Sequence, residues 1–298
     1  GLIGVNGAGK STLLNIITDI NNNSNEVYKR SNLSIGYLKQ NTGLDKESSI
    51  LTEMQKAFDD VLGAENELRQ LEDEMSKLSD HTGTEYKRVL AEYTRKQAYF
   101  DSRDGYNINV KIKTVLNGMG FSDKDSETLI KTLSGGEKTR LAIAKLLLEE
   151  PELLILDEPT NHLDFKTLNW LEEYLASYKG AILIVSHDRY FLDKTVNNIL
   201  ELERGHLFLY KGNYSSYLIQ KRERLALLKK QYDAQQAEIL KLQTYVDKNI
   251  SRASTAASAR SRQKALDNLE IVEYPEYTQK QIKLKFDILK ESYKDVLK

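Results

Sequence analysis

Cysteine is absent from the 298 residues of this sequence. Its absence excludes a disulfide framework, a zinc site with cysteine ligands and a cysteine nucleophile, and it suits a reducing cytoplasm. No stretch approaches the roughly 20 apolar residues that span a bilayer, so no membrane segment is expected. Because 43 basic residues face 44 acidic ones, the chain as a whole is no general binder of polyanions. The chain opens at Gly1 without an initiator methionine, from which we expect a piece of a longer protein.

Two short apolar runs predict an α/β unit with a mostly parallel sheet. Residues 153–156 and 181–185 are continuously apolar, which is typical of strands that a parallel sheet buries on both faces. Residues 198–210 predict a β-hairpin that turns at Arg204 and Gly205. We therefore expect residues 1–211 to form one α/β unit.

A helical insertion is predicted inside this unit, at about residues 51–104. Apolar residues from Met54 to Leu78 recur at alternating steps of three and four, the pattern of a coiled-coil helix. A polar break at residues 80–84 precedes a second amphipathic helix, and two such helices predict an antiparallel hairpin. Its 13 acidic residues outnumber its 8 basic ones, so a nucleic-acid backbone is not its expected partner.

Glycine and proline are absent between Asn213 and Tyr274, which favours a second helical region over residues 212–274. Residues 248–264 of this region contain no acidic residue. They contain five basic ones: Lys248, Arg252, Arg260, Arg262 and Lys264. Such a cluster can neutralise several phosphates of a nucleic acid, although a solvated helical spacer is an alternative. Residues 282–288 then alternate apolar and polar side chains like a strand.

Residues 4–11 match the phosphate-binding pattern G-x-x-x-x-G-K-[ST] in full. Glycines let the backbone N–H groups face the phosphates, Lys10 reaches the outer phosphate oxygens, and the Ser11 hydroxyl ligates Mg²⁺. The helix that follows adds its positive N-terminal end to the anion site. The expected nucleotide-binding residues are Gly4, Asn6, Gly7, Ala8, Gly9, Lys10, Ser11 and Thr12.

Two carboxylates follow the apolar run at residues 153–156. Neighbouring strand residues point to opposite sides, so Asp157 and Glu158 can have different roles. We assign Asp157 to the Mg²⁺ shell and Glu158 to the general base that polarises the attacking water.

Further motifs, in their order along the chain, resemble those of the ATP-binding-cassette superfamily. Gln40 resembles the glutamine that senses Mg²⁺ and the attacking water, and His187 resembles the switch histidine that contacts the γ-phosphate. Residues 161–164 are similar to the D-loop. The signature motif is matched by Ser134, Gly135 and Gly136. The resemblance implies that Glu158, His187 and Gln40 are catalytic, that Ser11, Gln40 and Asp157 hold the metal, and that the signature binds nucleotide.

The motifs at residues 161–164 and 186–192 resemble the F subfamily, whose members carry two cassettes in one chain. This resemblance implies an arm at residues 51–104, an interdomain linker at 212–274 and the start of a second cassette at 275–298. It further implies that ATP lies between two head-to-tail cassettes, so this chain needs the second cassette, or a second copy of itself, for full hydrolysis. The implied partner is the ribosome, whose rRNA and P-site tRNA the linker contacts.

Two alternatives to a translation factor or ribosome-protection ATPase stay open at this stage. One is the ATP-binding subunit of a transporter, against which the basic linker and the strand after it count. The other is a DNA-binding ATPase. The intact Glu158 and His187 favour a catalytic protein but do not choose between RNA and DNA as its partner.

Overall fold

The computed structural model describes residues 1–18, 30–38, 43–80, 83–251, 254–272 and 274. Gln40, Arg252 and the segment 275–298 lie outside the described residues. The chain divides into two compact units, Gly1–Tyr217 and Leu218–Lys298. In the part that the structure describes, no helix is both long enough and apolar enough to cross a bilayer.

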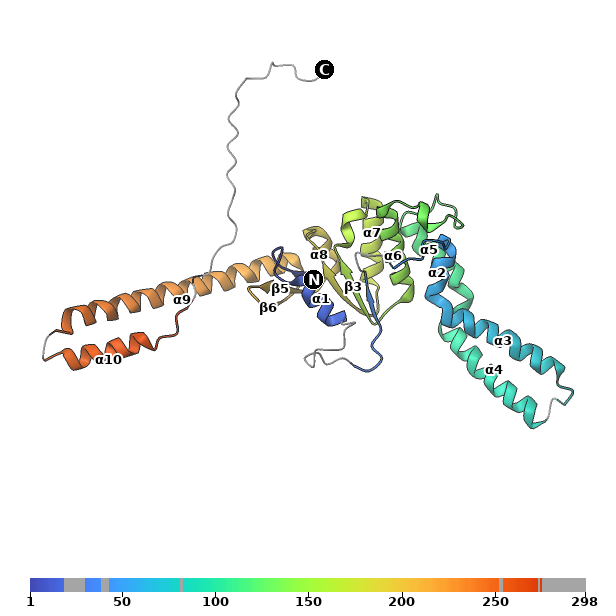
Figure 1. Cartoon of the computed structure of the whole chain (residues 1–298), viewed down its shortest axis with the longest axis horizontal. Coiled ribbons are helices and arrows are strands. Elements are labelled where there is room, and N and C mark those ends of the chain that lie inside the picture. Colours follow the sequence, from blue (N-terminus) through green and yellow to red (C-terminus); the bar gives the residue numbers. More distant parts are fainter. Residues whose placement is uncertain (19–29, 39–42, 81–82, 252–253, 273, 275–298) are drawn as a thin grey trace, which may run out of the picture. The chain divides into compact units, whose positions relative to one another are not determined.

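The first unit (Figure 1) is built on a six-stranded sheet. Its strand order is β2-β3-β4-β1-β5-β6. The strands are β1 (Leu2–Ile3), β2 (Ile35–Tyr37), β3 (Leu153–Asp157), β4 (Ala181–Val185), β5 (Asn198–Glu203) and β6 (His206–Lys211). All neighbours pair in parallel except β5 and β6, which form the predicted hairpin. Its turn residues Arg204 and Gly205 have φ angles of 50° and 79°, as a two-residue hairpin turn requires.

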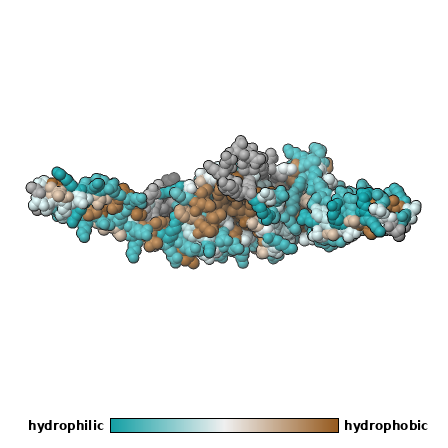
Figure 2. Space-filling view, turned by 90° about the horizontal axis from the view of Figure 1, so that it is seen from below, coloured by the Kyte–Doolittle hydropathy of each residue, from teal (hydrophilic) through white to brown (hydrophobic). Residues whose placement is uncertain are grey.

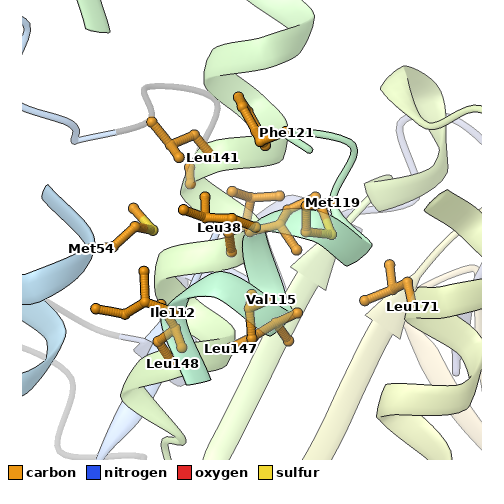
Figure 3. Packing of buried hydrophobic residues seen from close by; sticks show 14 of the residues in the cluster. Leu38, Met54, Ile112, Val115, Met119, Phe121, Leu141, Leu147, Leu148 and Leu171 are labelled. Carbon is orange, nitrogen blue, oxygen red and sulfur yellow. The ribbon is translucent and has the colours of Figure 1, made fainter. Parts of the chain in front are cut away.

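The sheet is covered on both faces, which confirms the expectation for the two apolar runs. On β3, Leu154 and Leu156 join one core cluster, whereas Ile155 between them joins the other. The smaller cluster packs against α1 (Lys10–Thr18) through Leu14. The larger cluster is formed with α5 (Ile108–Gly118), α6 (Gly135–Glu149) and α7 (Phe165–Ala176) (Figure 3), and with α8 (Arg189–Thr195). Each fully buried leucine contributes about 2 kcal/mol.

The helical insertion comprises α2 (Ile50–Gln55), a 3₁₀ turn η1 (Lys56–Phe58), α3 (Asp59–Lys77), α4 (Thr84–Ser102) and a second 3₁₀ turn η2 (Gly105–Asn107). The prediction of one coiled-coil helix from Met54 to Leu78 is wrong, because η1 interrupts it. Met54 and Phe58 are buried in the larger core cluster, whereas α3 packs along α4. One straight helix cannot both enter the main core and pack along α4, so the chain turns at η1.

The α3–α4 hairpin is held by polar contacts as well as by its buried seam. The Tyr93 hydroxyl donates to Glu72, the Tyr99 hydroxyl donates to Asp60, and Lys96 forms an ion pair with Glu67. The visible face of this hairpin is mostly hydrophilic (Figure 2). Exposed pairs of this kind each contribute little to stability, so the seam around Val61 and Leu68 dominates.

The second unit contains most of α9 (Tyr214–Asn249) and α10 (Ala256–Asp267), which pack as an antiparallel pair. The Gln235 side chain of α9 donates to the Glu270 carbonyl over 2.7 Å and accepts from the Val272 N–H over 2.8 Å. The helix α10 ends at Asp267, and Gln235 binds the backbone of the segment that follows it.

Candidate nucleotide-binding site

The loop between β1 and α1 has the backbone of an anion cradle. Gly7 and Gly9 have φ angles of 79° and 101°, which side-chain-bearing residues rarely adopt. A Cβ atom at Gly4 would lie 2.6 Å from the Leu202 carbonyl oxygen, so the loop needs glycine there to approach β5. Lys10 opens α1, and its Nζ donates to the carbonyls of Gly4 over 2.8 Å and Val5 over 3.3 Å. The Lys10 ammonium and the N–H groups at the start of α1 thus lie together at the phosphate loop.

The ends of β3 and β4 supply the opposite wall. Glu158 follows β3 in the left-handed region, with φ 49°, and its N–H donates to the Val185 carbonyl over 2.8 Å. The His187 N–H donates to Glu158 Oε2 over 3.3 Å, and His187 Nε2 lies 3.6 Å from Glu158 Oε1. The side chains of Glu158 and His187 are thereby held next to each other.

These two walls enclose a cleft of about 770 Å³. Nine of the residues expected from the sequence meet in its lining: Asn6, Gly7, Gly9, Lys10, Ser11, Thr12, Asp157, Glu158 and His187. Gly4 and Ala8 shape the loop without lining the cleft. Gln40 lies outside the described residues, and Leu38, just after β2, lines the cleft instead.

Three polar residues in the cleft were not expected there. Asn161 and His162 belong to the 3₁₀ turn η4 (Pro159–His162) after β3, and Thr139 belongs to α6. The D-loop resemblance names residues 161–164 without placing them at the nucleotide. Thr139 lies one helical turn beyond Gly135, whose carbonyl accepts from its hydroxyl over 3.2 Å. No sequence pattern places that turn of α6 at the cleft, because only tertiary packing brings it there.

Burial raises the pKa of Asp157 above its ordinary value, and the Lys10 ammonium opposes this shift. Burial and the neighbouring Asp157 also raise the pKa of Tyr37. The partly desolvated Asp157 carboxylate and the Ser11 hydroxyl line the same cleft and are the kind of hard oxygen ligands that Mg²⁺ prefers. Among the described residues, no group of three or more His, Asp or Glu side chains is placed so that it could hold a metal ion.

The signature residues lie elsewhere. The Ser134 hydroxyl accepts from the Glu137 N–H over 3.3 Å, and Glu137 Oε2 accepts from the Ser134 N–H over 2.8 Å, forming a capping box at the start of α6. This backbone bond and Lys124 lower the pKa of Glu137 to about 2. Ser134 and Gly135 are exposed, and Gly136 lies beside His162. Among the described residues, none of the three signature positions lines the cleft.

Three of the five predicted basic residues of the linker are exposed. Lys248, Arg260 and Lys264 are exposed, whereas the Arg262 guanidinium lies 3.6 Å from the centroid of the Tyr245 ring. Arg252 lies outside the described residues. Arg262 is thus stacked within the unit and holds its charge near α9.

Comparison with protein families decides what kind of nucleotide site this is. A family model described as "ABC transporter" matches residues 1–161, and a second model with the same description matches residues 200–286. The chain belongs to the ATP-binding-cassette (ABC) family. Its first unit is accordingly an ABC cassette, an ATPase domain that binds ATP, and its α/β fold confirms the fold class expected from the sequence.

Curated relatives of the cassette narrow the assignment to the F subfamily. The chain is 46% identical over its whole length to the "putative ATP-binding protein YdiF" of Bacillus subtilis (strain 168), of which it covers 46%. It is 37% identical over 92% of its length to the "uncharacterized ABC transporter ATP-binding protein YfmM" of the same organism, covering 52% of it. It is 36% identical over 87% of its length to the "energy-dependent translational throttle protein EttA" of Escherichia coli (strain K12), covering 46% of it. The chain thus spans about half the length of these relatives.

Proposed function

We propose that this chain is the first cassette and interdomain linker of an ABC-F translation factor or ribosome-protection ATPase that hydrolyses ATP to ADP and phosphate. The observation that carries the proposal is the cleft, in which the phosphate loop, Asp157, Glu158 and His187 face one space. The similarity to EttA, a translational throttle protein by name, supports a role in translation. The second cassette belongs to the same longer chain, or a second copy of this chain takes its place.

The residues that line the cleft have different roles in the proposed hydrolysis. The phosphate loop and Lys10 bind the phosphates. Ser11 and Asp157, with Gln40, would hold a Mg²⁺ ion, which would neutralise phosphate charge. Glu158 accepts the proton of the attacking water while the bond between the γ-phosphorus and the bridging oxygen of ADP breaks. The contact between Glu158 and the His187 N–H orients the carboxylate. His187 also contacts the γ-phosphate.

The signature residues complete the proposal across two cassettes. Ser134, Gly135 and Gly136 open α6 on an exposed surface and do not line the cleft of their own cassette. We assign them to the nucleotide of the opposing cassette, where the start of α6 adds N–H groups and dipole to the anion site. ATP binding then closes two cassettes and hydrolysis reopens them.

The linker is the proposed contact with rRNA and the P-site tRNA. Lys248, Arg260 and Lys264 are exposed, and with Arg252 and Arg262 they form a basic stretch without an acidic residue. Contacts of this kind weaken steeply with salt, because each one releases counterions from the phosphates.

Co-sedimentation of the full-length protein with ribosomes in ATP tests this function. Glu158→Gln removes the base, so we expect turnover to fall by at least about 10²-fold while ATP binding persists and the variant accumulates on ribosomes. Glu173→Gln, an exposed change on α7, is the control and is expected to behave like the wild type. If Glu158→Gln turned over ATP at the wild-type rate, Glu158 would not be the general base.

A second arm of the experiment tests the linker. Arg252, Arg260 and Arg262 are each changed to Glu, and we expect the protein to leave the ribosomal pellet while its ATPase activity without ribosomes stays unchanged. Arg222→Glu reverses one charge on an exposed part of α9 outside the basic stretch and serves as the control. Unchanged co-sedimentation of the triple variant would contradict the linker contact.

A further inference from the structure

The helix α9 begins inside the first unit, on a turn that the local sequence shapes. Gly212 has a φ of 107°, and a Cβ atom there would lie 2.7 Å from the Ser216 Cβ. The Asn213 side chain accepts from the Ser216 N–H over 3.1 Å, and the Asn213 carbonyl accepts from the Tyr217 N–H over 3.0 Å. These local contacts start the helix. Its direction depends on contacts with other elements.

Two carboxylates from outside α9 bind its first turn. Asp193 Oδ1 accepts from the Ser215 N–H over 2.7 Å, which places a negative charge at the positive end of the helix. Glu201 Oε1 accepts from the Tyr217 hydroxyl over 2.8 Å, and Glu201 Oε2 accepts from the Tyr210 hydroxyl over 3.3 Å. Glu201, Tyr210 and Tyr217 are each 5% exposed, so these bonds are made in a low-dielectric interior where breaking one is costly.

Asp193 is tied to the switch histidine by a short rigid helix. The helix α8 begins two residues after His187, and Asp188 caps it by accepting from the N–H groups of Tyr190 and Phe191. Phe191 is fully buried, which fixes α8 against the core. His187 and Asp193 therefore lie at the two ends of one short, well-anchored segment, six positions apart.

Glu201 is tied to the phosphate loop by the sheet. It pairs directly with Ile3, the last residue of β1 before the loop. The next residue, Leu202, approaches the loop itself, since its carbonyl lies 2.6 Å from the position of a Cβ at Gly4. The backbone that cradles the phosphates and the carboxylate that binds Tyr217 therefore belong to one tightly packed strand pair.

We propose that Asp193 and Glu201 form a clamp that couples the nucleotide cleft to the first turn of α9, so that nucleotide binding and the docking of this turn stabilise each other. The inference rests on the proposed function, because it takes the cleft to be the nucleotide site, and it adds positioning residues that contact no nucleotide. Two separate elements, α8 and β5, each contribute one carboxylate that binds the first turn of α9. By linkage, any stabilisation of the turn by nucleotide equals the gain in nucleotide affinity that the docked turn provides.

Hydrogen exchange of the full chain, read at the amides of Ser215, Ser216 and Tyr217, is the first measurement. We expect ATPγS with Mg²⁺ to slow exchange at these amides in the wild type. The result needs no variant, so it does not depend on whether a variant folds. A wild type that binds nucleotide and shows no change at these amides would overturn the clamp.

Binding of the fluorescent analogue mant-ATP with Mg²⁺ is the second measurement. Tyr217→Phe removes the hydroxyl that donates to Glu201, and we expect its affinity for mant-ATP to fall at least about fivefold. Tyr214→Phe is the matched control, because it removes a hydroxyl from the same turn, and no affinity change is expected. Asp193→Ala tests the other half of the clamp and is also expected to weaken binding.

The outcomes separate the clamp from the nucleotide site itself. If Tyr217→Phe and Asp193→Ala exchange faster at residues 215–217 with or without nucleotide and bind mant-ATP like the wild type, the two residues are only a helix cap. If the wild type does not bind mant-ATP at all, the proposed function fails, whatever the clamp does.

Discussion

Glu158 has a backbone conformation that a glutamate rarely adopts. Its φ of 49° costs about 1–2 kcal/mol relative to the right-handed region. Two contacts hold it there: its N–H donates to the Val185 carbonyl, and its carboxylate accepts from the His187 N–H. The turn after β3 thereby directs the carboxylate into the cleft, and strain is stored beside the reacting groups.

Glu137 makes the stability of the α6 start depend on pH. The pKa of its carboxyl is about 2 in the folded chain and near 4.5 in the absence of these contacts, so its contribution is fully present above pH 4.5 and is lost as the pH falls through 2. At pH 7 we expect Glu137→Gln to unfold at a lower urea concentration than the wild type, with a free energy of unfolding about 1 kcal/mol smaller. We expect this difference to shrink from pH 4.5 downwards. A difference that stays constant down to pH 2 would contradict this origin.

At the scale of elements, α2 is fastened to α6 by a buried ion pair. Glu53 is 1% exposed and accepts from Lys145 Nζ of α6 and from Lys56 Nζ, each over 2.6 Å. This contact joins the start of the helical insertion to the helix that begins with the signature motif. A buried carboxylate needs such partners, because removal from water disfavours its charge.

Loss of this carboxylate is expected to destabilise the cassette. Glu53→Gln removes the carboxylate that Lys145 and Lys56 share, although Lys56 keeps its pair with Asp45. Because both lysines are partly exposed, we expect the free energy of unfolding in urea to fall by about 1–3 kcal/mol. Glu65→Gln on α3 is the matched control, since the Arg69–Glu65 pair is exposed and is worth at most about 0.5 kcal/mol. Equal effects of the two substitutions would show that the buried pair contributes nothing special.

At the scale of the whole molecule, the separation of signature and cleft predicts complementation between copies of the chain. A Glu158→Gln copy lacks the base and a Ser134→Arg copy has a blocked signature, so we expect little turnover from either alone. If two copies share sites as proposed, the mixture would contain one intact site, made of the cleft of the Ser134→Arg copy and the signature of the Glu158→Gln copy. We expect ATP turnover, measured as phosphate release, to reappear in the mixture and to rise with concentration. No recovery at any ratio would contradict shared sites between copies.

The local chemistry of the nucleotide site is predictable from the sequence, because it depends on neighbours along the chain. The glycines of residues 4–11, the apolar runs before Asp157 and Ser186, and the turn at Arg204 and Gly205 each specify their own backbone. Together they determine an α/β unit with a phosphate cradle and two carboxylates at strand ends.

Only the tertiary structure decided which distant residues complete these parts. The turn at η1 follows from the burial of Met54 and Phe58 in the main core, Thr139 reaches the cleft through the packing of α6, and Gln235 binds Val272, 37 positions further along the chain. Such contacts join residues far apart in sequence, and their energies depend on burial and approach that no local pattern encodes. The sequence by itself determined the chemistry of the cleft, and the packed fold decided how the arm and the signature helix are held against the main core.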